Sequence, residues 1–177
     1  VPIGELSGLS MQPASYWHGN CPVSVVGYSI ESSDDEDGDH METTEHTFTV
    51  VIAAVANPPA ITGPDQVTGP EDTYLPIPGL SAELVDDEED KGYEMLSTFF
   101  AGVPDGSLFN HGVNAGSGSW AIPADKLSVL EFKAPLNYAG NFTLAFTAIS
   151  LELTSGDEAS SSLAIPVQVT PEADTFE

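Results

Sequence analysis

The sequence predicts an all-β protein built from Greek-key β-sandwich modules in tandem, and three observations support this fold class. Apolar residues alternate with period two over several short stretches, and no helical period is visible. Clusters of Gly, Pro, Asn and Asp separate these stretches about every ten residues, as in sandwich proteins. One pattern of apolar and glycine positions occurs twice along the chain, which indicates a repeated module.

Period-two alternation predicts three strands. Each set of alternating apolar residues indicates one face of a half-buried antiparallel strand. The sets are Phe48, Val50 and Ile52; Phe142, Leu144, Phe146 and Ala148; and Leu163, Ile165, Val167 and Val169. Pro166 interrupts the last set and has no backbone N–H, so it favours an edge strand or a bulge there. Turns are expected in the segments 102–106, 110–118 and 135–140, which contain Gly, Pro or Asn.

The internal repeat becomes visible when the sequence is shifted by 121 positions, a spacing at which Gly19-Asn20 coincides with Gly140-Asn141 and Glu31 with Glu152. Apolar and aromatic positions correspond as well, pairing Met11 with Phe132, Trp17 with Tyr138, Cys21 with Phe142, Val23 with Leu144 and Val25 with Phe146. After an acidic insertion in the first copy, residues 56–58 align with residues 173–175. We therefore expect residues 1–57 to be the C-terminal part of an incomplete module and residues 58–177 to be a complete one.

An incomplete sandwich would leave an apolar sheet face bare, which favours aggregation. We therefore expect the missing strands in a longer parent polypeptide or in a partner chain. A module split by an inserted domain gives the same pattern, and so does an arbitrary fragment boundary.

The charge balance excludes several classes of function. The 177 residues include 28 Asp and Glu but only 3 Lys and Arg, for a formal net charge of -25. Nucleic acid is excluded as a partner because its phosphates need clustered basic residues, and an anionic membrane would repel the chain. No apolar run approaches the roughly 18 residues of a membrane span, and no signal-peptide pattern opens the sequence, so no membrane insertion of this segment is expected. With 41% apolar residues the chain should fold once counter-ions offset its self-repulsion.

Acidic residues are bunched in loops, which suggests a cation as the counter-ion. The runs are Glu31, Asp34, Asp35, Glu36, Asp37, Asp39, Glu42 and Glu45; Glu83, Asp86, Asp87, Glu88, Glu89, Asp90 and Glu94; and the pair Glu71-Asp72. Flexible loops rich in carboxylates suit Ca²⁺, which takes six to eight oxygen ligands. The four histidines lack zinc-site spacing, and neither an EF-hand nor the GGxGxDxUx nonapeptide is present. Solvated loops and a general adaptation to high salt remain the alternatives, although the predicted strand faces carry Ser and Thr rather than carboxylates.

The complete copy resembles a known family of modules over nearly all of residues 60–177. The residues that support the resemblance are Gly69-Pro70-Glu71-Asp72-Thr73, Leu80-Ser81-Ala82-Glu83-Leu84-Val85-Asp86, Gly102-Val103-Pro104-Asp105-Gly106, Gly116-Ser117-Gly118-Ser119-Trp120, Leu127, Leu130, Pro135, Gly140-Asn141-Phe142-Thr143-Leu144, Ser150, Glu152, Gly156-Asp157 and Val169-Thr170-Pro171-Glu172-Ala173-Asp174. They resemble the tandem extender modules of large bacterial surface adhesins exported by type I secretion, called RTX adhesins. These modules are Ig-like or cadherin-like β-sandwiches. The match is specific for the module and does not indicate which adhesin.

The resemblance implies Ca²⁺ bound within modules and at the linkers between them, which stiffens the chain into a rod. Carried over position by position, the implied ligands are Glu71 and Asp72 at a junction; Asp86, Glu88 and Glu94 in the acidic loop; Glu152 and Asp157 in the late loop; Glu31 and Asp39 at its counterpart in the first copy; and Asp174 and Asn57 at the linker positions. The acidic loop departs from the family pattern, because residues 87–92 make it longer.

These observations predict a non-catalytic, Ca²⁺-stabilised stalk or scaffold segment of an extracellular bacterial surface adhesin. Its expected partners are neighbouring modules of the same polypeptide and an inserted ligand-binding domain, which it would present for adhesion or biofilm formation. The alternative is a glycan- or protein-binding module acting through its own loops, for which the candidate aromatic residues are Tyr93, Phe99, Phe100 and Phe109. Strand periodicity favours the core for most of them. Packing roles are likewise expected for Trp17 and Trp120, and a buried thiol for Cys21.

Overall fold

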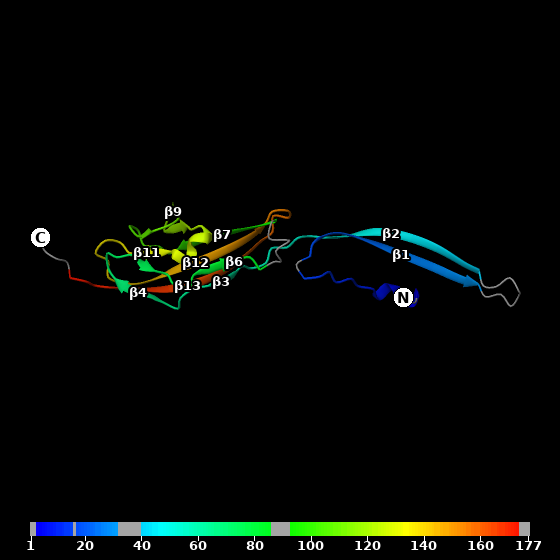
Figure 1. Cartoon of the computed structure of the whole chain (residues 1–177), viewed down its shortest axis with the longest axis horizontal. Helices are drawn as coiled ribbons and strands as arrows, with labels where there is room; N and C mark the ends of the chain where they lie inside the picture. The colour runs from blue at the N-terminus through cyan, green and yellow to red at the C-terminus, as the bar shows by residue number, and fades with distance from the viewer. Residues whose placement is uncertain (1–2, 16, 32–39, 86–92, 174–177) are drawn as a thin grey trace. The chain divides into compact units, whose positions relative to one another are not determined.

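The computed structural model describes residues 3–15, 17–31, 40–85 and 93–173. The chain forms two compact units, Val1–Ala54 and Val55–Glu177 (Figure 1). Within the described ranges, no helix is long and apolar enough to cross a membrane.

The first unit consists of a short 3-10 helix and one long hairpin. The helix η1 spans Ile3–Gly8, and strands β1 (Gly19–Glu31) and β2 (His40–Ile52) pair antiparallel from Gly19↔Ile52 to Glu31↔His40. The predicted strand at Phe48, Val50 and Ile52 therefore exists. Its predicted half-burial is wrong for Phe48, which is 45% exposed, because no second sheet layer covers the described part of this hairpin.

The second unit is an all-β sandwich, as predicted. Its largest sheet has the strand order β4-β13-β12-β7-β10-β9, with a three-stranded sheet β5-β11-β8 and a pair β3-β6 (Figure 1). The strands are β3 (Ala60–Thr62), β4 (Val67–Pro70), β5 (Leu75–Pro76), β6 (Ser81–Glu83), β7 (Glu94–Ala101), β8 (Leu108–Phe109), β9 (Val113–Gly116), β10 (Ser119–Ala121), β11 (Glu131–Lys133), β12 (Gly140–Glu152) and β13 (Glu158–Thr170). The 3-10 helix η3 spans Ala124–Val129.

Aromatic side chains fill the core between these sheets. Phe100 on β7 stacks on Phe109 of β8 at 5.0 Å between ring centroids and lies 5.2 Å from Phe146 of β12. Phe109 also meets Phe132 of β11 edge to face at 5.3 Å. Phe100, Phe132 and Phe146 are completely buried, and each such side chain contributes about 1.5–3 kcal/mol of transfer free energy. These contacts join the two layers into one module.

The two long predicted strands of this unit are confirmed as β12 and β13. Leu144, Phe146 and Ala148 on β12 and Ile165 on β13 are fully buried, and their neighbours along each strand face outward or lie half-buried. Pro166 keeps regular register opposite Thr143, so no bulge forms there. Its missing N–H is tolerated because β4 joins the other side of β13 only from Val167 onward.

The predicted turns are partly confirmed. Gly102 and Gly106 adopt φ values of 71° and 83°, and Asn137 in the segment 135–140 has φ 56°. The segment 110–118 is not simply a turn, because it contains strand β9. The glycines of this segment favoured the prediction of a turn, but β9 (Val113–Gly116) is an edge strand that pairs with β10.

The sequence repeat recurs in the secondary structure. The 3-10 helix η1 corresponds to η3, and strand β1 corresponds to β12, both at a spacing of 121 residues. The strand partners differ in spacing, because Gly19 pairs with Ile52 whereas Gly140 pairs with Val169. Eight residues separate Glu31 from His40, but only four separate Glu152 from Asp157, whose backbone groups are bonded at 2.8 Å. The first copy therefore has a longer acidic hairpin loop.

Candidate metal sites

Two buried carboxylates face each other at one end of the second unit. Glu94 opens β7 and pairs directly with Glu152, the last residue of β12. Glu94 is 7% exposed and Glu152 is 3% exposed. Side chains in such cross-strand pairs have Cβ atoms about 4.5–5.5 Å apart, and like charges in that position are destabilising. The strand pairing therefore forces two acidic groups together in a place that water hardly reaches.

The interdomain linker is bonded to this same end of the second unit. The backbone N–H of Ala56 donates to a carboxylate oxygen of Asp157 at 3.0 Å, and Ser150 Oγ donates to the carbonyl of Asn57. The turn after β12 is closed by Glu152 N–H donating to Asp157 O at 2.8 Å and by Thr154 Oγ1 donating to Glu152 Oε1 at 3.0 Å. Four of the sequence-predicted ligands, Asn57, Glu94, Glu152 and Asp157, thus lie at one end, which we call the linker end.

The donor set at the linker end is composed of oxygen atoms. Carboxylates, an Asn side chain and backbone carbonyls are the ligands that Ca²⁺ prefers, whereas Zn²⁺ would need His or Cys. Among residues 3–15, 17–31, 40–85 and 93–173, however, no group of three or more His, Cys, Asp or Glu side chains is placed to hold a metal ion. A cation at the linker end would therefore need further oxygens besides the Glu94 and Glu152 pair.

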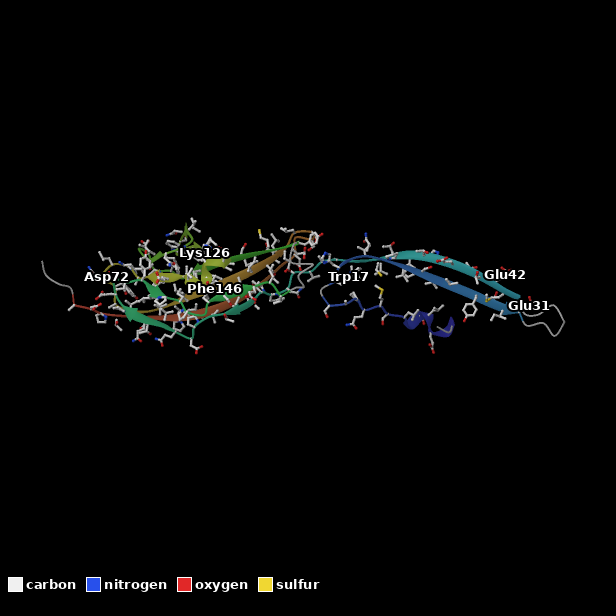
Figure 2. The ribbon with its side chains drawn as sticks, viewed as in Figure 1. Trp17, Glu31, Glu42, Asp72, Lys126 and Phe146 are labelled. Carbon is white, nitrogen blue, oxygen red and sulfur yellow. The ribbon has the colours of Figure 1, made fainter. Side chains whose placement is uncertain are left out.

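Asp72 lies at the opposite end of the unit, which we call the distal end (Figure 2). Glu71 lies there too, directly after strand β4, which pairs with the C-terminal part of β13. Glu71 Oε1 accepts from Glu172 N–H at 2.9 Å, and Asp72 Oδ1 accepts from Asn137 N–H at 3.0 Å. Thirteen-residue strand β12 separates the two ends, a length of about 40 Å at the usual rise of a strand. The predicted ligands of this unit thus form two separate groups.

The remaining predicted ligands are not brought into either group. Glu31 is exposed at the end of β1, at the position that corresponds to Glu152 (Figure 2). Asp39, Asp86, Glu88 and Asp174 lie outside the described residues.

Carboxylates are sparse on the outward face of the longest sheet. The exposed residues of β13 after Glu158 include Ser160, Ser162, Gln168 and Thr170. Elsewhere Lys126 Nζ lies 2.8 Å from the Asp125 carboxylate, and the hydrogen bond from Lys126 holds the pKa of Asp125 below its usual value. The outward face of β13 after Glu158 thus lacks carboxylates, as expected, whereas Glu42 and Glu45 of the first acidic run lie exposed within strand β2 rather than in a loop.

Several other sequence predictions have clear outcomes. Trp120, Phe100 and Phe109 are buried in the core, as expected. Trp17 packs against Gly19 but is 41% exposed, so it does not lie in a core. Cys21 is only partly buried, so its thiol is not the buried one that was expected. In the second unit Phe142, the counterpart of Cys21, packs against Phe132 of β11, a strand without a counterpart in the described part of the first unit.

Ser150 is the residue at the linker end that the ligand prediction missed. It is completely buried and bonds the linker carbonyl of Asn57. Its position was visible in the sequence, because Ser150 continues the alternation of Phe146 and Ala148 toward Glu152. A polar residue at the end of an apolar strand face indicates a buried polar contact.

Comparisons with known proteins identify no family. No protein-family model matches the chain, and no curated protein matches it. Among solved structures 14 chains match, and one of them is zebrafish RET cadherin-like domains 1 to 4. That match has 15% sequence identity and a TM-score of 0.28, and it covers 85% of this chain and 41% of the other. The chain therefore spans less than half the length of that structure, and the fold class is established by the sheets described above.

Proposed function

We propose that this chain is a non-catalytic, Ca²⁺-stabilised stalk or scaffold segment of an extracellular adhesin of the bacterial surface. It would stiffen the polypeptide and present ligand-binding domains for adhesion or biofilm formation. The observation that supports this proposal best is the cross-strand pair of buried carboxylates, Glu94 and Glu152, at the end to which the linker is bonded.

A positive charge would stabilise the carboxylate pair. Burial disfavours the ionised form of a carboxylate, and two carboxylates opposite each other repel as well. A divalent cation offsets both terms at once, and Ca²⁺ tolerates the irregular geometry of loop oxygens better than Mg²⁺ does. In the proposed site Glu94 and Glu152 bind the ion together with oxygens of Asp157, Asn57 and the acidic loop, to which Asp86 and Glu88 belong.

The same ion would stiffen the linker. Pro58 and Pro59 already restrict the path of residues 55–59, and Asp157 and Ser150 bond the residues just before them. A cation bound by Asn57 and by the strand ends would strengthen that attachment. At the distal end, Glu71, Asp72 and Asp174 would serve the junction with a following module.

Calcium binding to a variant of the carboxylate pair tests the proposed site. Isothermal titration of CaCl₂ into the chelator-treated chain should lose its tightest binding event in Glu152→Gln, because a neutral amide ligates Ca²⁺ far less well than a carboxylate. In EDTA the same variant should melt above the wild type, since it removes one of two like charges. The matched control is Glu158→Gln, which neutralises an exposed glutamate six residues along the same hairpin. Unchanged Ca²⁺ binding in Glu152→Gln would contradict the site.

The alternative of a binding module acting through its own loops has less support. Of its candidate aromatic residues, Phe100 and Phe109 belong to the core, Phe99 is half-buried, and Tyr93, which is 51% exposed, remains accessible. One exposed tyrosine does not form an aromatic platform for a glycan.

A further inference from the structure

The first unit contains the counterpart of only the second half of the sandwich. In the second unit, β12 lies between β13 and β7, whereas in the described part of the first unit β1 pairs with β2 alone. The edge of β1 that corresponds to the β7 side of β12 is therefore open. Open strand edges present unpaired N–H and C=O groups that can accept another strand.

The side chains of the first unit show the same deficit. Met11, which corresponds to the completely buried Phe132, is 47% exposed. Val25, which corresponds to the completely buried Phe146, is 43% exposed. Figure 2 shows Phe146 inside the second unit. Apolar positions that match core positions are thus uncovered in the first unit.

Some of these positions line a groove. Met11, Trp17 and Cys21 border an apolar hollow of about 320 Å³ in the first unit. In the second unit the corresponding residues Phe132, Tyr138 and Phe142 contact one another at 5.4 and 5.8 Å. There the ring of Phe109 from β8 packs on Phe132 at 5.3 Å. The groove therefore lies where an aromatic residue of a β8-like strand would insert.

The backbone beside the groove is also short of partners. Residues 131–133 form strand β11 because β5 and β8 pair with it on its two sides. The corresponding residues 10–12 form no strand, although the elements on both sides of them repeat with the same spacing. This segment is therefore placed to become a strand once two partners are added.

Local geometry around the groove already matches the complete module. Gly140, with φ 157°, lies beneath Tyr138, whose hydroxyl is 3.1 Å from the point where a Cβ would stand. Gly19, with φ 126°, lies beneath Trp17 in the same way, with a ring carbon 3.8 Å from that point. An aromatic residue two positions before a glycine thus forms the same wall in both units.

We infer that the open edge of β1 and the groove bind a polypeptide segment of the same kind as residues 60–121, whose strands complete the sandwich of the first unit. Such a segment would add a β7-like strand along residues 24–31 and β5- and β8-like strands on residues 10–12, in the mode of strand addition. A second copy of this chain fits less well, because its residues 60–121 already pair within the sheets of its own second unit.

A fusion protein tests this inference without an unknown ligand. A second copy of residues 60–121 is placed directly before Val1 of the full chain, because residue 121 precedes Ile122, the counterpart of Val1. In millimolar CaCl₂, amides of residues 24–31 should exchange at least about a hundredfold more slowly than in the unfused chain, as expected for amides that enter a folded sheet. Cys21, the single cysteine of the sequence, should react more slowly with a thiol reagent.

Two further variants make the result decisive. The fusion with Phe100→Asp and Phe109→Asp in the added copy should lose both changes, because charges would replace the core rings. A fusion with Met11→Phe and Val25→Phe in the first unit restores the ring sizes to which residues 60–121 are fitted. Protection of residues 24–31 in either fusion with the intact copy supports the inference. Its absence in both, while the second unit still melts normally, would overturn the inference. A second result would also overturn the inference: ultracentrifugation shows a dimer of the unfused chain, and thiol labelling shows that Cys21 is protected in it. A second copy of the chain would then cover the open edge and the groove.

Discussion

Glu94 and Glu152 show how a strand register can place two acidic side chains next to each other. Each residue alone would be an ordinary strand-end glutamate, but direct pairing across β7 and β12 makes them neighbours in a nearly dry position. The hydrogen bond from Thr154 occupies one oxygen of Glu152 and adds no charge. Two carboxylates in direct cross-strand positions repel each other, and the oxygen-rich surroundings suit a cation such as Ca²⁺.

Single core residues should differ sharply between the two units. Phe146→Ala removes a completely buried ring that contacts Phe100, so the free energy of unfolding of the second unit should fall by about 3–5 kcal/mol. Phe48→Ala removes a ring that is 45% exposed on β2 of the first unit. It should change the free energy of unfolding of the second unit by less than about 0.5 kcal/mol. Chemical denaturation of both variants, followed by circular dichroism, measures the difference. Equal losses would contradict the assignment of the core to the second unit.

The linker is hydrogen-bonded to the β12–β13 hairpin, and hydrogen exchange at a single amide reports this contact. The N–H of Ala56 donates to Asp157, so its hydrogen exchange reports whether the linker stays attached. If Ca²⁺ strengthens this end, EDTA should accelerate exchange of the Ala56 amide by at least about tenfold, as for a local opening that becomes easier. Amide exchange measured by NMR in CaCl₂ and in EDTA checks this.

The control for the linker experiment lies within the same sheet. Ile122 lies directly after β10, and its amide donates to the carbonyl of Thr98 on β7 at 3.0 Å. Exchange of this amide should be far less sensitive to EDTA. Equal acceleration at Ala56 and Ile122 would indicate that the whole unit loosens and would contradict a local effect at the linker.

Long regular strands could be predicted from the sequence, and short ones could not. Alternation over β12 and β13 was visible because each strand has thirteen residues and one buried face. Strands β5 and β8 have two residues each, too few to show a period, and their strand state depends on pairing with β11. Residues 10–12 make the same point, since the sequence pattern of β11 is present there without its partners.

The candidate site was predictable in composition but only partly in grouping. The resemblance to extender modules implied Asn57, Glu94, Glu152 and Asp157 as ligands, and the strand pairing and hydrogen bonds place them at one end. The sequence did not show that Glu71 and Asp72 lie at the other end, because that depends on the parallel pairing of β4 with β13. Non-local pairing of this kind leaves no local pattern in the sequence.

For the whole molecule, the formal net charge of -25 has two possible explanations, which are a generally acidic surface screened by salt and dedicated cation sites. Self-repulsion destabilises a compact state and is relieved by any salt through screening, whereas a dedicated site is stabilised by one ion at low concentration. The placement of carboxylates at the ends of β7, β12 and β4, with Ser and Thr on the outward face of β13, favours dedicated sites.

The measurement that tests this most directly is a thermal melt of the full chain in EDTA, in millimolar CaCl₂, in matched MgCl₂ and in molar KCl. A native-state site occupied at a hundred times its Kd adds about 2.7 kcal/mol, which for a unit of this size raises Tm by roughly 10 °C. We expect a rise of this order in CaCl₂ and a much smaller one in MgCl₂ and in KCl. Equal stabilisation by MgCl₂ or KCl would contradict dedicated Ca²⁺ sites and would show that the acidic loops are a screened surface.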